Sequence, residues 1–220
     1  MEERKYGKVL TVVLIVIAVA VVGLLGFFGY DLYKKHSDKK QAEKAVEDFY
    51  DSFDDSGNGD NSGNIEIPLL DEQLEERTTS SGKKRTMYKG YNVVGTIEIP
   101  SIKLKYPILE RVTKDSIEKS VAVLQPSAGP NKVGNTTIVG HNYRNGSFFG
   151  NNDRLSNGDK IYITDESGTR LKYNIYNIYT TSPDDADYML RDTNGKREIS
   201  LSTCTDNSKE RLIIWAVEEQ

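Results

Sequence analysis

An uncharged run of 20 residues, Val9 to Phe28, constrains this chain more than any other feature. A helix of about 20 apolar residues crosses roughly 30 Å of bilayer hydrocarbon. A cleaved signal peptide is the alternative, since Ala18-Val19-Ala20 could mimic a cleavage site. The run continues for eight residues past Ala20, however, which a signal peptide does not need. We therefore expect residues 1–30 to form a short cytoplasmic tail and an uncleaved, single-pass transmembrane anchor in the cell membrane.

The orientation of this anchor does not follow from charge alone. Basic residues stand before the run, and four lysines follow it, at 34, 35, 39 and 40. The positive-inside rule therefore does not predict the orientation of the span. A short leader and a large polar portion after the span fit a domain outside the cell. Residues 87–220 carry seventeen basic and seventeen acidic side chains, a net charge of zero, so we expect no nucleic-acid partner.

Residues 31–86 are expected to form an amphipathic helix and a flexible linker. The helix is predicted from apolar residues at the spacing of one helical face: Ala42, Ala45, Val46, Phe49, Tyr50 and Phe53. A solvated linker helix is the alternative, but two phenylalanines on one stripe favour docking against the domain. Residues 54–64 contain no apolar side chain, so this segment is expected to be flexible. A second polar stretch, 78–86, ends the linker.

Residues 87–220 read as many short strands separated by turns, which predicts an all-β domain. We expect a closed β-barrel of about eight strands with short helices. Pro107 suggests an edge strand. Ser182-Pro183-Asp184 predicts a helix over 182–190, with serine as its cap. The aspartates at 184, 185 and 187 are then explained as helix-start residues better than as a calcium site. The predicted strands are 93–99, 102–109, 134–140, 160–164, 170–180, 198–203 and 211–217.

Cys204 is the only cysteine of the chain, so it forms no internal disulfide. Outside the cytoplasm, a leftover cysteine suggests a reactive thiol or an intermolecular link. The chain has two histidines, and His36 lies in a lysine-rich stretch beside the membrane segment. Any thiol–imidazole chemistry must therefore use His141. The alternative is a buried, inert cysteine. In a strand, Cys204 would share its face with Ser200 and Ser202, which predicts the wall of a polar cleft.

Four blocks follow one another along the sequence: Gly95-Thr96-Ile97-Glu98-Ile99-Pro100, Gly140-His141-Asn142, Leu201-Ser202-Thr203-Cys204 and, shortly after, Arg211. Together with the N-terminal apolar run, these blocks resemble the sortases, the membrane-anchored cysteine transpeptidases of Gram-positive bacteria. The family signature reads T-L-x-T-C, and Ser200 replaces its first threonine with another hydroxyl. The resemblance covers roughly Val93 to Glu218. The block from His141 to Gly150 is most similar to class B, although class B sortases usually carry a longer helix before the cysteine strand.

The resemblance implies a role for each residue of the site. Cys204 would be the nucleophile, and His141 would pass a proton to and from the reacting amines. Arg211 is charged at any physiological pH, so it would hold the substrate carbonyl or the oxyanion. The alternative for Arg211 is a surface ion pair with Asp206 or Glu210. The expected substrate-binding residues are Ser202, Thr203 and Asn142, and no cofactor or metal is expected.

The implied substrate is a secreted protein whose C-terminal sorting signal holds a Pro- and Thr-containing pentapeptide before a hydrophobic tail. A thioacyl-enzyme would transfer it to an amine of peptidoglycan or of a lipid-linked precursor. Two other functions remain open from the residues. An L,D-transpeptidase-like cell-wall enzyme would need a glycine before its cysteine, where this chain has Thr203. A non-catalytic, membrane-tethered β-barrel binding module would keep Cys204 inert.

Overall fold

The computed structural model describes residues 3–54, 85–143, 145–205 and 208–219. Contacts divide the chain into two compact units, Met1–Gln41 and Ala42–Gln220. The segments predicted to be flexible, 54–64 and 78–86, lie outside the described residues apart from Asp54, Arg85 and Thr86. The second unit therefore holds the end of the N-terminal helix together with the β-domain.

A single helix, α1 (Glu3–Asp54), contains both the uncharged run and the predicted amphipathic stripe. Within the described residues, α1 is the one helix long and apolar enough to cross a membrane, with a mean hydropathy of 2.7 in its most apolar window. No helix-breaking proline interrupts it, because the first proline of the sequence is Pro68. The uncharged run and the apolar stripe therefore lie in one continuous helix.

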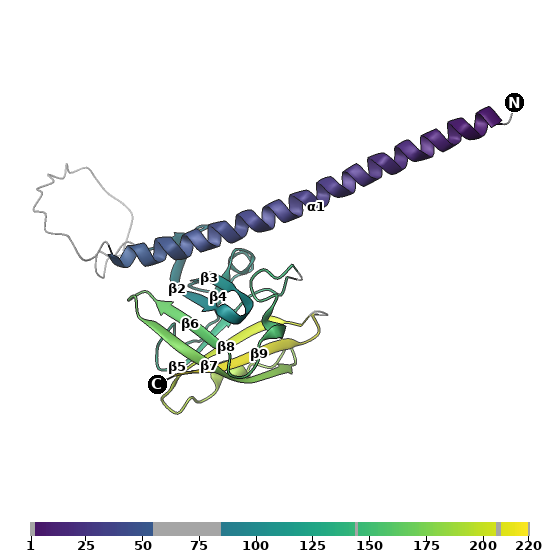
Figure 1. Ribbon diagram of the computed structural model, residues 1–220. Helices are drawn as coiled ribbons and strands as arrows, with labels where there is room; N and C mark the ends of the chain where they lie inside the picture. The colour runs from purple at the N-terminus through teal and green to yellow at the C-terminus, as the bar shows by residue number, and fades with distance from the viewer. Residues whose placement is uncertain (1–2, 55–84, 144, 206–207, 220) are drawn as a thin grey trace, which may run out of the picture. The chain divides into compact units, whose positions relative to one another are not determined.

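The β-domain is a closed barrel of eight strands, as the sequence predicts (Figure 1). Its strands follow the order β2-β3-β4-β5-β8-β9-β7-β6, and β6 pairs back to β2. A two-residue strand, β1 (Met87–Tyr88), pairs with β2 outside this ring. The barrel strands are β2 (Tyr91–Ile99), β3 (Leu104–Leu109), β4 (Val121–Val123), β5 (Gly134–Val139), β6 (Lys160–Asp165), β7 (Arg170–Thr181), β8 (Arg197–Cys204) and β9 (Arg211–Glu218).

The barrel interior is filled by branched aliphatic side chains, which suit a pleated and crowded surface. Ile199 and Leu201 belong to this core, as the alternation along their strand predicts. Ser200 and Ser202 lie on the opposite face, but both are buried. Ser200 donates hydrogen bonds to Asn135 Oδ1 and to the Tyr188 carbonyl. The predicted polar face is therefore partly covered by the connection between β7 and β8.

Three expectations about elements need correction. The helix before β8 is α2 (Asp187–Leu190), and its cap position is Ala186 rather than Ser182. Ser182 accepts the Asp184 amide in a turn instead, so its hydroxyl does not cap a helix. Pro107 does not mark an edge strand, since β3 lies between β2 and β4. The pairing with β4 includes only Ile108 and Leu109, so Pro107 interrupts no bond on that side.

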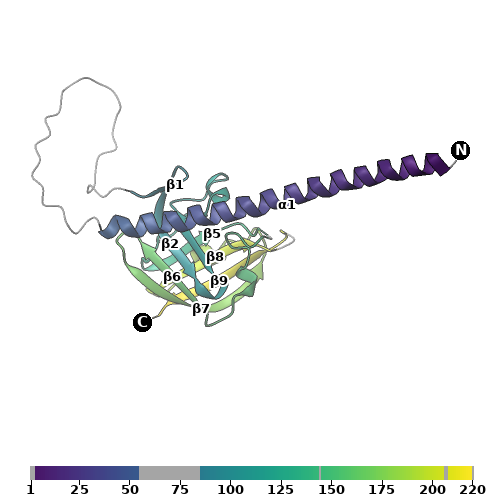
Figure 2. The same cartoon turned by 45° about the horizontal axis from the view of Figure 1, so that its top comes forward.

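The last turns of α1 pack on the outside of the barrel, as the apolar stripe predicts (Figure 2). Phe49 is 2% exposed and Val46 fully buried. Tyr50 adds a polar contact, because its hydroxyl donates to Glu98 at 2.9 Å and lies 3.1 Å from the Thr96 hydroxyl. We call the buried apolar residues of this contact the docking cluster; its members are Ala42, Ala45, Phe49, Tyr88, Val93, Leu109 and Ala122.

Candidate active site

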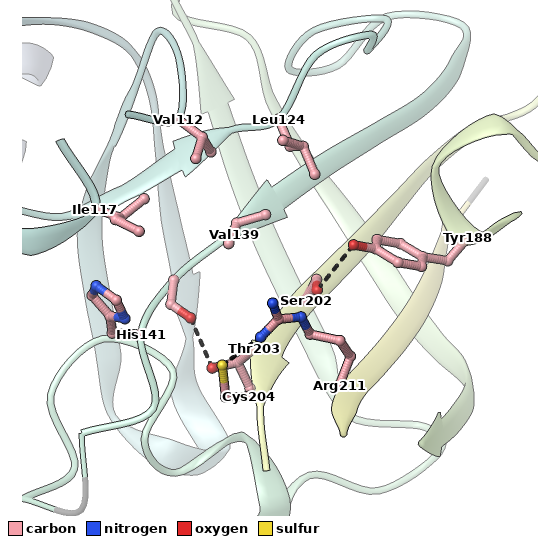
Figure 3. A pocket seen from close by; sticks show the side chains of 11 residues that line it. Val112, Ile117, Leu124, Val139, His141, Tyr188, Ser202, Thr203, Cys204 and Arg211 are labelled. Carbon is pink, nitrogen blue, oxygen red and sulfur yellow. Dashed lines mark hydrogen bonds between the residues drawn. The ribbon is translucent and has the colours of Figure 1, made fainter. Parts of the chain in front are cut away.

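One end of the barrel gathers the residues that the sequence singles out. Strands β5 and β8 run parallel, with Val139 opposite Ser202, so both end at the same mouth. Strand β9 runs antiparallel to β8 and begins there, which puts Arg211 opposite Cys204. A pocket of about 310 Å³ opens at this mouth (Figure 3). Its lining includes Cys204, Arg211 and His141 together.

Cys204 and Arg211 are in direct contact. The Arg211 Nη1 group donates a hydrogen bond to Cys204 Sγ, as the dashed line in Figure 3 marks. The cysteine is free and only partly buried. The thiolate is the nucleophilic form of cysteine, and a permanent cation beside the sulfur compensates its charge. Among the described residues, no ion pair joins Arg211 to Glu210, and Asp206, the other partner of the predicted alternative, lies outside them.

His141 is held at the mouth through its backbone. The preceding Gly140 is packed so closely that a Cβ would lie 2.8 Å from Val121 Cγ1 and 2.9 Å from Phe149 Cδ2. The Gly140 carbonyl accepts the Thr203 hydroxyl at 2.7 Å. The His141 carbonyl accepts the Phe149 amide at 3.0 Å. The segment that carries the imidazole is thus tied both to the cysteine strand and to the buried Phe149.

The imidazole of His141 faces a carboxylate that sequence reasoning missed. Its Nε2 lies 3.2 Å from Glu118 Oε1, an ion-pair distance when the imidazole is protonated. Glu118 ends the short helix η3 (Ser116–Glu118). Its Oε2 accepts a hydrogen bond from the Tyr143 hydroxyl. Burial, followed by this hydrogen bond and the Glu118 charge, raises the pKa of Tyr143 to about 12.

The three residues expected to bind substrate have different environments. Ser202 and Thr203 line the pocket, but Thr203 donates its hydroxyl to the backbone. The Ser202 hydroxyl lies 3.4 Å from the Tyr188 hydroxyl. Asn142 is not part of the pocket lining, and its Nδ2 donates to the Cys204 carbonyl at 2.9 Å. Asn142 therefore ties the His141 segment to the end of the cysteine strand.

The rest of the pocket wall is mostly apolar, and sequence reasoning did not identify it. Tyr188 of α2 contributes an aromatic ring to it. The connection that carries Tyr188 is anchored by Arg191, which forms an ion pair with the buried Glu198 and stacks 4.6 Å from the Trp215 ring centre. Arg191 also donates to Asn135 Oδ1. The aliphatic wall consists of Val112, Ile117, Leu124 and Val139.

The aspartates before α2 are engaged in local hydrogen bonds. Asp185 accepts the Thr181 hydroxyl and the Asp187 amide. These bonds lower the pKa of Asp185. In the described part of the chain, no group of three or more His, Cys, Asp or Glu side chains is arranged to hold a metal ion.

Comparisons with known proteins agree with this architecture. The family model described as the sortase domain matches residues 97–219, which is 123 of the 220 residues. Sortase A of Bacillus anthracis is 32% identical over 125 residues, and the alignment covers 55% of this chain and 58% of that protein. This chain thus spans little more than half the length of that relative.

Two solved structures extend the likeness to the fold. A Clostridium perfringens sortase D5 transpeptidase is 25% identical, with a TM-score of 0.57 over 83% of this chain and 98% of that one. Clostridium perfringens sortase C, solved with the C-terminal cell wall sorting motif, is 29% identical, with a TM-score of 0.50 over 58% of this chain and 71% of that one. With the family match covering more than half of its residues, the chain belongs to the sortase family.

Proposed function

We propose that this protein is a cysteine transpeptidase that joins secreted proteins to an amine of the cell wall. The observation that carries the proposal is the contact between the Arg211 guanidinium and the Cys204 sulfur in the pocket that His141 also lines. A nucleophile, an oxyanion donor and a proton-transfer group are the three parts that acyl transfer needs. Residues 87–220 would form the catalytic domain.

The proposed reaction begins with attack of the Cys204 thiolate on the carbonyl carbon of the scissile peptide bond. The carbonyl π electrons move to oxygen, and Arg211 stabilises that oxyanion because its guanidinium already lies beside the sulfur. When the oxyanion collapses, the C–N bond breaks and protonated His141 donates its proton to the leaving amine. A thioacyl-enzyme remains.

The second half of the reaction reverses these roles. An incoming amine attacks the thioester carbon, and neutral His141 accepts the proton that the amine loses. The C–S bond then breaks, and the thiolate of Cys204 is restored with the new amide released. Arg211 cannot replace His141 in either half, because a guanidinium does not give up its proton in proteins.

The proposed substrate is a C-terminal sorting signal with a Pro- and Thr-containing pentapeptide, and the proposed acceptor is a peptidoglycan or lipid-linked precursor amine. The solved sortase C that contains a sorting motif supports this class of substrate. The aliphatic wall of the pocket suits the apolar residues of such a peptide. The apolar part of α1 would anchor the enzyme in the membrane, with the catalytic domain outside the cell. The relatives described above are sortases A, C and D, so the similarity to class B stays a prediction.

Mass spectrometry of residues 42–220 tests the proposal. A panel of synthetic peptides, each with a Pro- and Thr-containing pentapeptide, is incubated with the protein in the presence and absence of triglycine as acceptor. We expect an acyl adduct on Cys204 without acceptor and a ligated product with it. Cys204→Ala should give neither, and His141→Ala should give no ligated product.

Circular dichroism of both variants provides the control for folding. A panel that yields no adduct in the wild-type protein, while Cys204 stays inaccessible to iodoacetamide, would contradict the proposal. It would favour the non-catalytic binding module that the sequence leaves open.

A further inference from the structure

We propose that Glu118 is a positioning residue for His141, whose carboxylate bridges the imidazole and the Tyr143 hydroxyl and holds the imidazole for proton transfer. The inference deepens the proposed function and rests on it. Glu118 does not contact the reacting sulfur in this assignment. It would act through His141, as the third group of a nucleophile–base pair orients the base.

The contacts around the imidazole support this role. His141 Nε2 has no solvent-accessible surface and makes no aligned hydrogen bond to a described residue, yet it lies 3.2 Å from Glu118 Oε1. The two groups therefore lie at the distance of an ion pair, which forms when the imidazole is protonated. The Tyr143 hydroxyl binds the other oxygen of the same carboxylate. The Tyr143 ring also packs against the imidazole, with the ring centres 5.2 Å apart.

Other charged and titratable groups near His141 come from different elements. Arg211 of β9 and Cys204 of β8 line the same pocket as the imidazole. Tyr143 belongs to the segment of His141 itself, and Glu118 comes from η3. Glu118 is the one carboxylate paired with His141 among the ion pairs of the described residues. Within the described residues, the charged groups at this mouth thus include the Glu118 carboxylate beside the imidazole and the Arg211 guanidinium in the same pocket.

The turn that carries Glu118 is firmly built. Thr113 and Ser116 exchange hydrogen bonds, since each side-chain oxygen accepts the amide of the other residue at 2.7–2.9 Å. The fully buried Ser120 donates its hydroxyl to the Pro107 carbonyl at 2.6 Å. Ile117 lines the pocket and also packs against the docking cluster. The backbone on both sides of Glu118 is thereby fixed relative to the barrel.

The Glu118 carboxylate should contribute little to the stability of the fold. The Glu118 side chain is 50% exposed. Ion pairs of exposed groups contribute little to stability in proteins. Replacing Glu118 should therefore change catalysis while leaving the fold nearly as stable. This difference separates a positioning residue from a residue that only supports the turn.

The test compares Glu118→Gln with the wild-type protein on two substrates. One is the panel peptide that the wild-type protein cleaves fastest, and the other is its thioester analogue, in which a thiol replaces the leaving amine. A thiolate leaves without a proton, so its departure does not depend on the position of His141. Acyl-enzyme formation is followed in single turnovers without an acceptor amine, because the later aminolysis uses His141 for both substrates. We expect the acylation rate of the amide to fall about ten- to hundredfold and that of the thioester to change less than threefold. The peptide concentration that gives half the maximal rate should stay within twofold.

Three further variants sharpen the test. Glu118→Asp keeps the charge on a shorter side chain and should retain an intermediate rate. Tyr143→Phe removes the hydroxyl that donates a hydrogen bond to the Glu118 carboxylate. It should slow the amide reaction less than Glu118→Gln does. Asp115→Asn is the matched control, because Asp115 belongs to the same turn but contacts Tyr91 and Lys119. Its amide rate should stay within twofold of the wild-type rate.

Two outcomes would contradict the role of Glu118 without contradicting the proposed function. One is an unchanged amide rate in Glu118→Gln, and the other is equal slowing on the amide and the thioester. If Glu118→Gln does not fold, the same conclusion follows when Glu118→Asp and Tyr143→Phe each slow the amide and the thioester equally. A wild-type protein that cleaves neither substrate would refute the proposed function, and the inference with it.

Discussion

At the scale of single residues, the position of Arg211 follows from strand register. Cys204 ends one strand and Arg211 begins the next, and antiparallel pairing puts the two residues opposite each other. Their side chains therefore point to the same face and meet at the mouth of the barrel. Six residues separate them in the sequence. A shift of register by one residue would move Arg211 to the other face.

Replacing Arg211 with lysine should impair the enzyme although the charge is kept. Lysine lacks the planar fork that can bind the sulfur and the oxyanion together. Loss of one oxyanion donor costs about 10²–10³ in kcat in well-studied enzymes, and we expect a fall of about this size in kcat/KM on the amide peptide. Arg197→Lys is the matched control, because Arg197 pairs with Glu218 on the barrel surface. A near-normal rate in Arg211→Lys would show that the reaction needs only a positive charge at this position.

The sequence predicts some site residues and not others for a physical reason. Cys204 is unique and His141 is one of two histidines, so counting alone brings them together. Glu118 is one of 33 acidic residues, and Tyr188 is one of 13 tyrosines. Nothing in the spacing of such common residues indicates which of them will face His141. Only the turn at η3 brings Glu118 to His141, and only the anchored connection before β8 brings Tyr188 to the pocket wall.

At the scale of elements, the last turns of α1 are part of the second unit. Phe49 is nearly fully buried in the docking cluster. Phe49→Ala should destabilise the domain by about 3 kcal/mol through lost burial and the cavity left behind. For a domain of this size, that lowers Tm by roughly 6–12 °C. Differential scanning calorimetry of residues 31–220 measures the shift.

Two comparisons test this docking prediction. Leu32→Ala is the control, because Leu32 is 67% exposed and should leave Tm unchanged. Deleting residues 31–53 should lower Tm by several degrees without touching a pocket residue. An unchanged Tm after this deletion would show that the segment is only a spacer.

The hydrogen bond between Tyr50 and Glu98 belongs to the same contact, and its contribution to stability should depend on pH. Burial alone would raise the pKa of Glu98, but hydrogen bonds from Arg170 and Tyr50 and the nearby positive charges together lower it below the ordinary value of 4.5. A carboxylate with a lowered pKa stabilises the fold above its unfolded pKa and loses this contribution as the pH falls through the folded pKa. Its contribution is therefore present at pH 7 and lost in acid.

Tyr50→Phe tests this dependence. The variant should lose about 1 kcal/mol of unfolding free energy at pH 7. The difference from the wild-type protein should shrink as the pH falls through the lowered pKa of Glu98, where this carboxylate gains a proton. Urea unfolding of both proteins at pH 7 and at a series of acidic pH values below the ordinary pKa of 4.5 measures it. A difference that grows on acidification would contradict the assigned role of the carboxylate.

The elements that the sequence missed are short ones. Strand β4 has three residues and β1 has two, which is too short for an alternating pattern to emerge. The helix before β8 was expected from Ser182, because serine, proline and acidic residues there imitate a capped helix. Instead Ser182 and Asp185 each bind a nearby amide and form turns, so regular helix begins only at Asp187.

At the scale of the whole molecule, one helix contains both a segment that fits a membrane anchor and a docking segment. The apolar window of α1 meets the length and hydropathy of a membrane span. The full chain should therefore sediment with membranes and resist extraction by carbonate. A chain that begins at Gln41 should remain in the soluble fraction. Release of the full chain by carbonate alone would contradict an integral anchor.

The single cysteine makes the proposed orientation testable without engineering the catalytic domain. Cys204 is partly exposed at the mouth of the barrel, so a charged maleimide that does not cross membranes should label it in intact cells if the domain lies outside. The tail is tested in a Cys204→Ala background with Glu3→Cys, which should be labelled only after lysis. The charge pattern does not predict this orientation, because basic residues flank both ends of the span. Labelling of Glu3→Cys in intact cells, with Cys204 protected until lysis, would reverse the topology and put the domain in the cytoplasm, away from any cell-wall amine.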